Sequence, residues 1–215
     1  MSRSYGQYCG LARALDVVGD RWNLLIVRQL LIAPARYQAL LDGLPGVATN
    51  LLADRLRDLE AVGVIERRLA EHGRAITYAL TTWGAQLREP IDGLIRWSTP
   101  LMIRGPEGDT FHPDGLLVAL PALLKGRAVA DRSSTVGITV NGDTDRRVVQ
   151  VRATPSGIEV TPQDDRELDA VLSADAPIIL GLAAGVLALN DVLGLVDIQG
   201  DEDAVRAIFA APVNP

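Results

Sequence analysis

Residues 36–68, RYQALLDGLPGVATNLLADRLRDLEAVGVIERR, are the stretch that decides the fold of this chain. Their pattern predicts a short helix over 37–41 and a longer helix over 50–62. The Leu-Pro-Gly-Val turn between them stops the first helix and reverses the chain before the second one begins. The longer segment carries leucines at helical spacing, so one face of it must pack on a core. These leucines are Leu52, Leu56 and Leu59.

A two-stranded ribbon is expected to follow directly. Residues 64–68 and 76–80 have the composition of strands, with a turn between them. Helix, turn, helix and a basic ribbon is the order of parts in a winged helix-turn-helix that reads DNA. Periodicity alone equally allows a helical hairpin and a ribbon that only belong to a small core. The order of parts and the basic residues of the ribbon, Arg67, Arg68 and Arg74, favour DNA binding.

Composition places few restrictions on the fold but several on the class of protein. With 48% hydrophobic and 22% charged residues, the 215-residue chain has the composition of an ordinary soluble protein. No signal-peptide pattern and no uninterrupted apolar run of bilayer length occurs, so we expect a cytoplasmic, nucleoid-associated protein and no membrane partner. The single cysteine excludes an intramolecular disulfide.

Charge is distributed unevenly along the chain. Residues 1–104 contain 13 arginines against 10 acids, a net charge of +3, whereas residues 105–215 contain 8 basic residues against 17 acids, a net charge of −9. This asymmetry indicates that the first half meets nucleic acid and the second does not. The acidic surface of the second half also favours solubility.

Three further helices are expected in the first half. One spans 9–18, the next begins with Asp20 as its N-cap, and the last runs from Thr81 or Thr82 to about Leu101. The last helix carries an apolar stripe that must pack on something. We expect the tryptophans to pack in the core, with a subunit interface as the alternative. They are Trp22, Trp83 and Trp97.

Several motifs of the first half together resemble the HxlR-type winged helix-turn-helix regulators of bacteria. The resemblance covers about residues 5–102. It implies a homodimer, held by the first and last helices of the domain, on a roughly palindromic double-stranded operator, with repression as the default mode of regulation. The matching motifs are CGLARALDVVGDRWNLLIVR at 9–28, RY at 36–37, LPGV at 44–47, LRDLE at 56–60, GVI at 63–65 and YALTTWG at 78–84.

The recognition helix departs from the family pattern. Where relatives commonly have Ser-Pro-Arg or Ser-Gln-Lys, this chain has Ala-Thr-Asn at 48–50, so a basic base-reading side chain is missing. Thr49 can still cap the helix, Asn50 could pair with an adenine edge, and Asp54 could accept from a cytosine amino group. Arg55 has an ion pair with Asp58 or Glu60 as an alternative to phosphate. The predicted DNA contacts are Arg36, Thr49, Asn50, Arg55, Arg57, Arg67, Arg68 and Arg74.

Cys9 is a candidate redox sensor. In some relatives the cysteine at this position bridges subunits when it is oxidised. Cys9 lies at a predicted helix start with Arg13 one turn later, and both features favour the thiolate. The alternative is a small buried hydrophobe, which is the commoner role of a lone cysteine.

The second half is expected to be a separate α+β domain, with a sheet packed on helices. The Gly- and Pro-containing segment after residue 104 suggests domains at 1–104 and 110–215. The predicted elements are helices over 116–124, 175–185 and 201–209 and strands over 134–141, 147–153, 157–161, 170–173 and 195–199.

The oily helix at 178–189 and the segment at 196–209 resemble sterol-carrier-protein-type lipid-binding domains over roughly 112–210. This resemblance implies a hydrophobic tunnel and a hydrophobic small-molecule effector. Candidate lining residues, each of which could instead be ordinary core, are Leu116, Leu120, Leu123, Ile179, Leu182 and Val186.

No enzymatic or cofactor motif emerges from the sequence. With two histidines and one cysteine, no metal cluster of the usual ligands can form, and no nucleophile elbow or phosphate-binding loop is present. We therefore expect no cofactor. The sequence favours the interpretation that the protein is a DNA-binding transcriptional regulator, that it acts as a repressor, and that a hydrophobic small molecule controls it. The alternative is a lipid-binding protein whose helix-turn-helix serves mainly for dimerisation.

Overall fold

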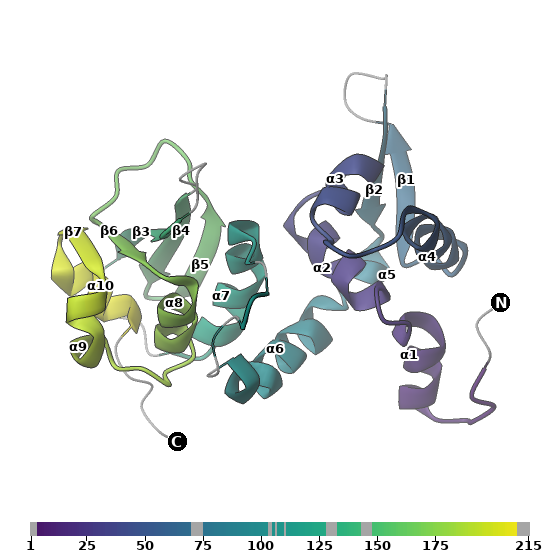
Figure 1. Ribbon diagram of the computed structural model, residues 1–215, viewed down its shortest axis with the longest axis horizontal. Coiled ribbons are helices and arrows are strands. Elements are labelled where there is room, and N and C mark those ends of the chain that lie inside the picture. Colours follow the sequence, from purple (N-terminus) through teal and green to yellow (C-terminus); the bar gives the residue numbers. More distant parts are fainter. Residues whose placement is uncertain are drawn as a thin grey trace. The chain divides into compact units, whose positions relative to one another are not determined.

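The computed structural model describes residues 4–69, 75–102, 105, 107–109, 111–127, 133–142 and 148–209. The chain divides into two compact units, Met1–Ile91 and Asp92–Pro215 (Figure 1). The division falls within one helix, α6. Within the described residues, no helix is both long enough and apolar enough to cross a bilayer.

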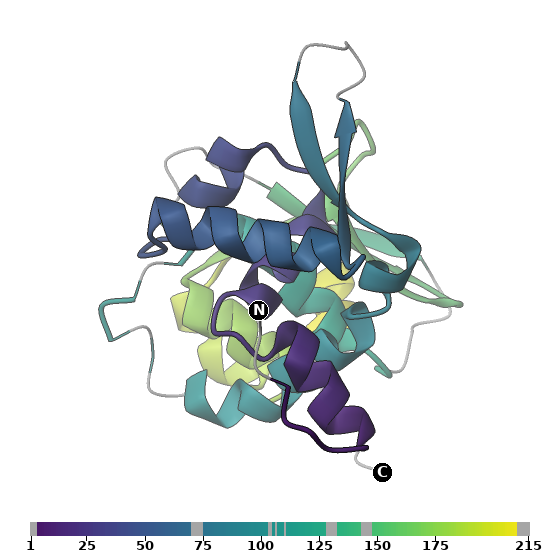
Figure 2. The same ribbon diagram turned by 90° about the vertical axis from the view of Figure 1, so that its right-hand side faces the viewer.

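The first unit is a helix-turn-helix followed by a β-hairpin. The elements are α1 (Gly10–Val18), α2 (Asn23–Ile32), α3 (Tyr37–Asp42), α4 (Thr49–Ala61), β1 (Ile65–Leu69), β2 (Ile76–Leu80), α5 (Thr82–Ala85) and the start of α6 (Arg88–Met102). Strands β1 and β2 are antiparallel, with Ile65 opposite Leu80. Ala35 adds a bridge to Tyr78 in the middle of β2, so the hairpin is bound to the segment that follows α2. Figure 2 shows the hairpin extending away from the helices. The predicted winged helix-turn-helix is confirmed.

Helix α4 ends in a Schellman motif, which fixes the entry into the wing. Gly63 has φ +80°, its N–H donates to the carbonyl of Glu60, and the N–H of Val64 donates to the carbonyl of Leu59. The side chains of Leu59 and Val64 are both buried. The leucine stripe predicted for this helix lies in the core, with Leu52, Leu56 and Leu59 at most 1% exposed.

Two helices, α5 and α6, replace the single long helix expected after the wing. Thr81 caps α5, as predicted, by accepting from the N–H of Gly84 at 3.0 Å, and its hydroxyl donates to the carbonyl of Gly63 at 2.7 Å. The helix then breaks at residues 86–87. Pro90 explains the break, because it has no N–H to bond the carbonyl four residues earlier but fits in the first turn of a new helix.

The second unit is a five-stranded mixed sheet with helices packed on it, which confirms the α+β class. The strands are β3 (Ser134–Val140), β4 (Val148–Thr154), β5 (Gly157–Pro162), β6 (Ala170–Ala174) and β7 (Asp197–Gly200), in the order β5-β4-β3-β6-β7. Only β3 and β6 are parallel among these pairs. The helices are η1 (Pro113–Gly115), α7 (Leu116–Leu124), α8 (Ala176–Ala183), α9 (Leu189–Val192), η2 (Leu193–Leu195) and α10 (Glu202–Phe209).

One arginine ties two helices of the second unit together. The guanidinium of Arg127 donates to the carbonyls of Leu182 at 2.7 Å, Ala183 at 2.8 Å and Ile208 at 3.2 Å. These carbonyls lie at the C-terminal ends of α8 and α10, where a cation is favourable. Burial lowers the pKa of Arg127, and the three carbonyls accept from three of its five N–H donors.

Candidate nucleic-acid interface

The outward face of α4 carries the residues that could read DNA. Asn50 and Arg57 are exposed, and Asp54 is partly exposed, on the face opposite the buried leucines. Thr49 is also exposed, but its expected capping role is wrong. Ala48 is the N-cap, with extended dihedrals, and Thr49 is the first helical residue, so its hydroxyl is not placed to accept from the first turn. The face therefore offers amide, carboxylate, guanidinium and hydroxyl groups.

Side-chain hydrogen bonds join α3 to α4 and α2 to the end of α3. The hydroxyl of Tyr37 in α3 donates to the carbonyl of Thr49 at 2.7 Å. The amide of Gln29 in α2 donates to the carbonyl of Gly43, at the end of α3, at 2.5 Å. Because these bonds join α2, α3 and α4, the outward face of α4 is presented by a fixed scaffold.

The expectation that Asp20 caps α2 is wrong. Trp22 occupies the N-cap position, and the Asp20 carboxylate is instead paired with the guanidinium of Arg55 in α4. Arg55 also pairs with Asp58 at 3.4 Å, and its side chain is only 20% exposed. Of the two roles open for Arg55, the structure has the ion pair with Asp58, and Asp20 is a second partner that sequence reasoning missed.

Each of the other predicted arginines of α4 and the wing that the structure describes also has an acidic partner. Arg57 pairs with Asp54, three residues earlier on the same helix. Arg67 in β1 makes a two-pronged contact with Glu60, with N–O distances of 2.7–2.9 Å. This contact lowers the pKa of Glu60, chiefly through the hydrogen bond from Arg67.

The remaining predicted DNA contacts are two basic residues of the wing and one residue that precedes α3. Arg68 pairs with Glu66 at 2.5 Å, two residues earlier in β1. Arg36 precedes α3 and is exposed. Arg74 lies outside the described residues. The i,i+3 and i,i+2 spacings of the Arg57 and Arg68 pairs were visible in the sequence, whereas the Asp20–Arg55 and Glu60–Arg67 pairs depend on the fold.

Known proteins similar to this chain match its helix-turn-helix. The model of a family described as HxlR-like helix-turn-helix matches residues 17–104. YvaP, an uncharacterised HTH-type transcriptional regulator of Bacillus subtilis, is 34% identical over 88 residues, which are 40% of this chain and 82% of YvaP. YodB, an HTH-type transcriptional regulator of the same organism, is 31% identical over 86 residues, 40% of this chain and 77% of YodB. The chain belongs to the HxlR-like helix-turn-helix family.

Not every relative is covered to the same extent. An uncharacterised HTH-type transcriptional regulator of Synechocystis is 34% identical over 84 residues, which are 39% of this chain but only 62% of that protein. A crystal structure of quinone-bound YodB is 29% identical and covers 42% of this chain and 96% of that one, with a TM-score of 0.37. The HxlR-like relatives are named as transcriptional regulators, so the part of this chain that they match belongs to a class of proteins that are not enzymes. The family model ends at residue 104, and the sterol-carrier-type resemblance of the second unit stays a prediction.

Large apolar side chains are exposed on α1 and on α6. Leu11 and Leu15 are exposed on α1, and Leu94 and Leu101 on α6. Trp97 on α6 is 75% exposed. Core packing, which was expected for the tryptophans, is therefore wrong for Trp97, and also for Trp83, which is 52% exposed. A helix whose apolar stripe is left uncovered is typical of a subunit interface.

Cys9 is exposed and occupies the N-cap position of α1. The expectation of a buried small hydrophobe is therefore wrong. The pKa of the Cys9 thiol is lowered, chiefly by the backbone N–H groups of Ala12 and Leu11 in the first turn of the helix. A thiol that is accessible and has a lowered pKa is the kind that reacts with oxidants.

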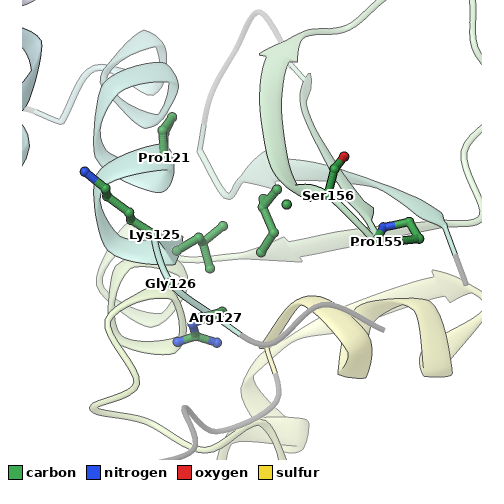
Figure 3. Close-up of a pocket in the computed structure, with 9 residues that line it drawn as sticks. Pro121, Lys125, Gly126, Arg127, Pro155 and Ser156 are labelled. Carbon is green, nitrogen blue, oxygen red and sulfur yellow. The ribbon is translucent and has the colours of Figure 1, made fainter. Parts of the chain in front are cut away.

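The second unit contains a cavity of about 360 Å³ between the end of α7 and the β4–β5 turn. Figure 3 shows Pro121 on α7, with Lys125 and Arg127 below it and Pro155 and Ser156 facing them from the turn. The apolar part of the cavity wall is formed by Pro121, Leu124, Pro155 and Ile158. The sequence shows the Pro-Ser-Gly turn, but its proximity to the end of α7 is a property of the fold.

The predicted ligand-lining residues lie elsewhere in the second unit. Leu116, Leu120, Ile179 and Leu182 are fully buried members of the core cluster, and Leu123 packs against it. Val186 is 49% exposed. None of the six lines the cavity at the end of α7.

Helix α7, which contributes to the cavity wall, is hydrogen-bonded to α6. The guanidinium of Arg96 in α6 donates to the carbonyl of Ala122 in the last turn of α7 at 3.2 Å. Within the described part of the chain, no group of three or more His, Cys, Asp or Glu side chains is placed to hold a metal ion.

Proposed function

We propose that this protein is a dimeric repressor that binds a roughly palindromic operator through α4 and the β1–β2 wing. One observation carries the proposal. The face of α4 opposite its buried leucines is free of core packing and presents Asn50 and Arg57 to solvent. A polar helix face held on a rigid scaffold is what major-groove reading requires.

Thr49, Asn50 and Arg57 contact base edges in the major groove in this proposal. Arg36, Arg67, Arg68 and Arg74 contact phosphate or the minor groove. The ion pairs of Arg67 and Arg68 do not prevent this, because exposed pairs contribute only about 0–1 kcal/mol and can be exchanged for phosphate. Arg57 has further N–H donors besides those that contact Asp54. Arg55 is mostly structural, since two carboxylates hold its less exposed side chain.

The dimer is supported by the exposed apolar residues of α1 and α6. Leu11 on α1 and Leu94 and Trp97 on α6 leave apolar surface that a second copy would cover. Two copies present two recognition helices, which matches an operator built of two half-sites.

Control by a hydrophobic small molecule is supported by the cavity at the end of α7. Its proline, leucine and isoleucine side chains suit the apolar part of a ligand, and Lys125, Arg127 and Ser156 add polar groups to the wall. A ligand there would alter the last turn of α7, to which Arg96 of α6 is bonded. It regulates only if it binds the DNA-competent and incompetent states unequally.

Control through Cys9 is the second candidate. Its exposure and lowered pKa support a thiolate that oxidants reach. The related regulator YodB, 31% identical to this chain, is the subject of a crystal structure with bound quinone. A quinone is therefore the reagent to test, with Cys9→Ser as the control that must lose the response and keep DNA binding.

DNA binding is tested by mobility shift with the DNA upstream of the protein's own gene, at two salt concentrations. The double variant Asn50→Ala, Arg57→Ala should lose at least tenfold in affinity for the specific site. Arg166→Ala is the matched control, because Arg166 is a similarly exposed, ion-paired arginine of the second unit. A dimer that is folded but shifts no upstream DNA would contradict the proposal and favour a lipid-binding role.

A further inference from the structure

We propose that Asp54 and Arg57 act as one unit that reads a single G·C base pair in the operator. The inference rests on the proposed DNA-binding function and names the sequence that α4 selects. Asp54 is an acid on a surface that must approach DNA. A general affinity of that surface for phosphate does not explain why an acid lies there.

Both side chains lie in the open on the recognition helix. Arg57 is 70% exposed and Asp54 is 49% exposed, and the guanidinium is ion-paired with the carboxylate. Arg55, between them in sequence, has a different environment, because its side chain is 20% exposed and is held by Asp20 and Asp58. No core packing accounts for the Asp54–Arg57 pair, so its groups are available at the surface of the helix.

A carboxylate in the major groove is repelled by phosphate unless it accepts a hydrogen bond from a base. The cytosine N4 amino group is the donor that Asp and Glu take, and the guanine O6 and N7 atoms are the acceptors that arginine takes. A G·C pair presents these groups side by side. A carboxylate and a guanidinium that touch each other on one helix therefore match the two halves of one base pair.

The ion pair can persist in the complex. A guanidinium has five N–H donors and a carboxylate has about four lone-pair sites, so each can keep a bond to the other and still contact its base. The pair then orients both groups before DNA arrives, which lowers the entropy lost on binding.

The position of Asn50 on α4 predicts how far its adenine lies from the G·C pair within one half-site. Asn50 and Asp54 are one turn apart, and Asn50 and Arg57 are two turns apart, which is about 6 Å and 10 Å along a helix. With base pairs about 3.4 Å apart, the adenine proposed for Asn50 lies about two to three base pairs from the G·C pair.

Selection from a random duplex library with the full-length protein tests this inference. The wild type should enrich one G·C pair in each half-site, two to three base pairs from an adenine. Asp54→Ala should lose preference at that position alone, by about fivefold to 100-fold, while preferences elsewhere remain. Asp42→Ala, which removes an exposed acid of α3 away from the outward face of α4, should leave all preferences unchanged.

The possible outcomes distinguish a failure of the base-pair-reading role of Asp54 from a failure of DNA binding by the whole protein. Unchanged preference at every position for Asp54→Ala, with circular dichroism showing a folded protein, would overturn the pair-reading role while DNA binding stands. Recovery of no sequence by the wild type would overturn DNA reading itself, and the role of Asp54 with it. Arg57→Lys gives a second measure, because lysine keeps the charge but lacks the planar fork, and guanine preference should fall.

Discussion

Arg96 in α6 donates a 3.2 Å hydrogen bond to the carbonyl oxygen of Ala122 in α7. This carbonyl belongs to the last turn of its helix, where carbonyls lack an intrahelical partner. The residues that follow, Leu124 and Lys125, line the cavity of the second unit. The bond thus anchors to α6 the turn of α7 that contributes Pro121 and Leu124 to the cavity wall.

Removal of this bond should destabilise the second unit. Arg96→Ala is expected to lower the free energy of unfolding by about 1 kcal/mol, because an orphan carbonyl loses a charged donor at a partly exposed site. Urea unfolding measures the change. Arg152→Ala removes an exposed arginine paired with Glu159 at 3.9 Å and should cost less than about 0.5 kcal/mol. Equal effects of the two variants would contradict the anchoring role.

Gly84 is predicted to be intolerant of any side chain. A Cβ at this position would overlap the carbonyl oxygen of Val64. Gly84→Ala should therefore destabilise the first unit by about 3 kcal/mol. Gly93→Ala in α6 is the control, because a Cβ there meets nothing within 4 Å and alanine favours the helix by about 0.5–1 kcal/mol. Thermal unfolding that ranks Gly93→Ala as the more harmful change would refute this account.

Release of Arg67 from Glu60 should strengthen DNA binding. Glu60→Gln removes the carboxylate from which the Arg67 guanidinium must be released to reach phosphate, so affinity should rise by up to about fivefold, the equivalent of an exposed pair worth about 0–1 kcal/mol. Arg67→Ala removes the cation itself, and the slope of log affinity against log salt should become shallower by about 0.9. In the wild type, the lowered pKa of Glu60 keeps the pair intact until the pH falls below the usual glutamate range. Fluorescence anisotropy over a salt series gives the affinities and the slopes, and an unchanged slope for Arg67→Ala would mean that Arg67 does not contact phosphate.

The rate of alkylation of Cys9 should rise with pH, with a midpoint pH below that of an ordinary thiol. The N–H groups of Ala12 and Leu11 stabilise the thiolate, so the pKa is lowered only while α1 is folded. The associated stability is present above the unfolded pKa and is lost as pH falls through the folded pKa. The rate of reaction with iodoacetamide is measured against pH in buffer and in urea. Because Cys9 is the only cysteine, the signal has one source. Equal midpoint pH values in buffer and in urea would contradict the proposal that the folded helix α1 lowers the pKa of Cys9.

Substitution of Trp97 should disrupt the proposed dimer. Trp97→Glu places a charge within the exposed apolar residues of α6, where burial against a second copy would be costly. Light scattering should report a monomer. Leu195→Glu is the control, since Leu195 is exposed to a similar extent in the second unit. A dimer that survives Trp97→Glu would exclude this part of α6 from the interface.

Local pattern was sufficient to predict most elements, because proline, glycine and apolar spacing act over a few residues. The helix at Leu116–Leu124 and the strand at Ile76–Leu80 have the predicted bounds. The ion pair between Asp20 and Arg55 joins residues 35 apart, and no local pattern indicates it. The exposure of Trp97 was missed for a different reason, because apolar spacing reports that a side chain packs but not whether its partner is another molecule.

The hydroxyl of Thr81 binds Gly63 at the start of the wing and Gly84 just after its end. The base of the hairpin is therefore fixed independently of its tip. The segment between Leu69 and Ile76 can consequently be exchanged for tips of other lengths and charges without moving α4. Chimaeras that carry the wing tips of relatives would show how far minor-groove preference can be transplanted between family members while base reading by the helix stays constant.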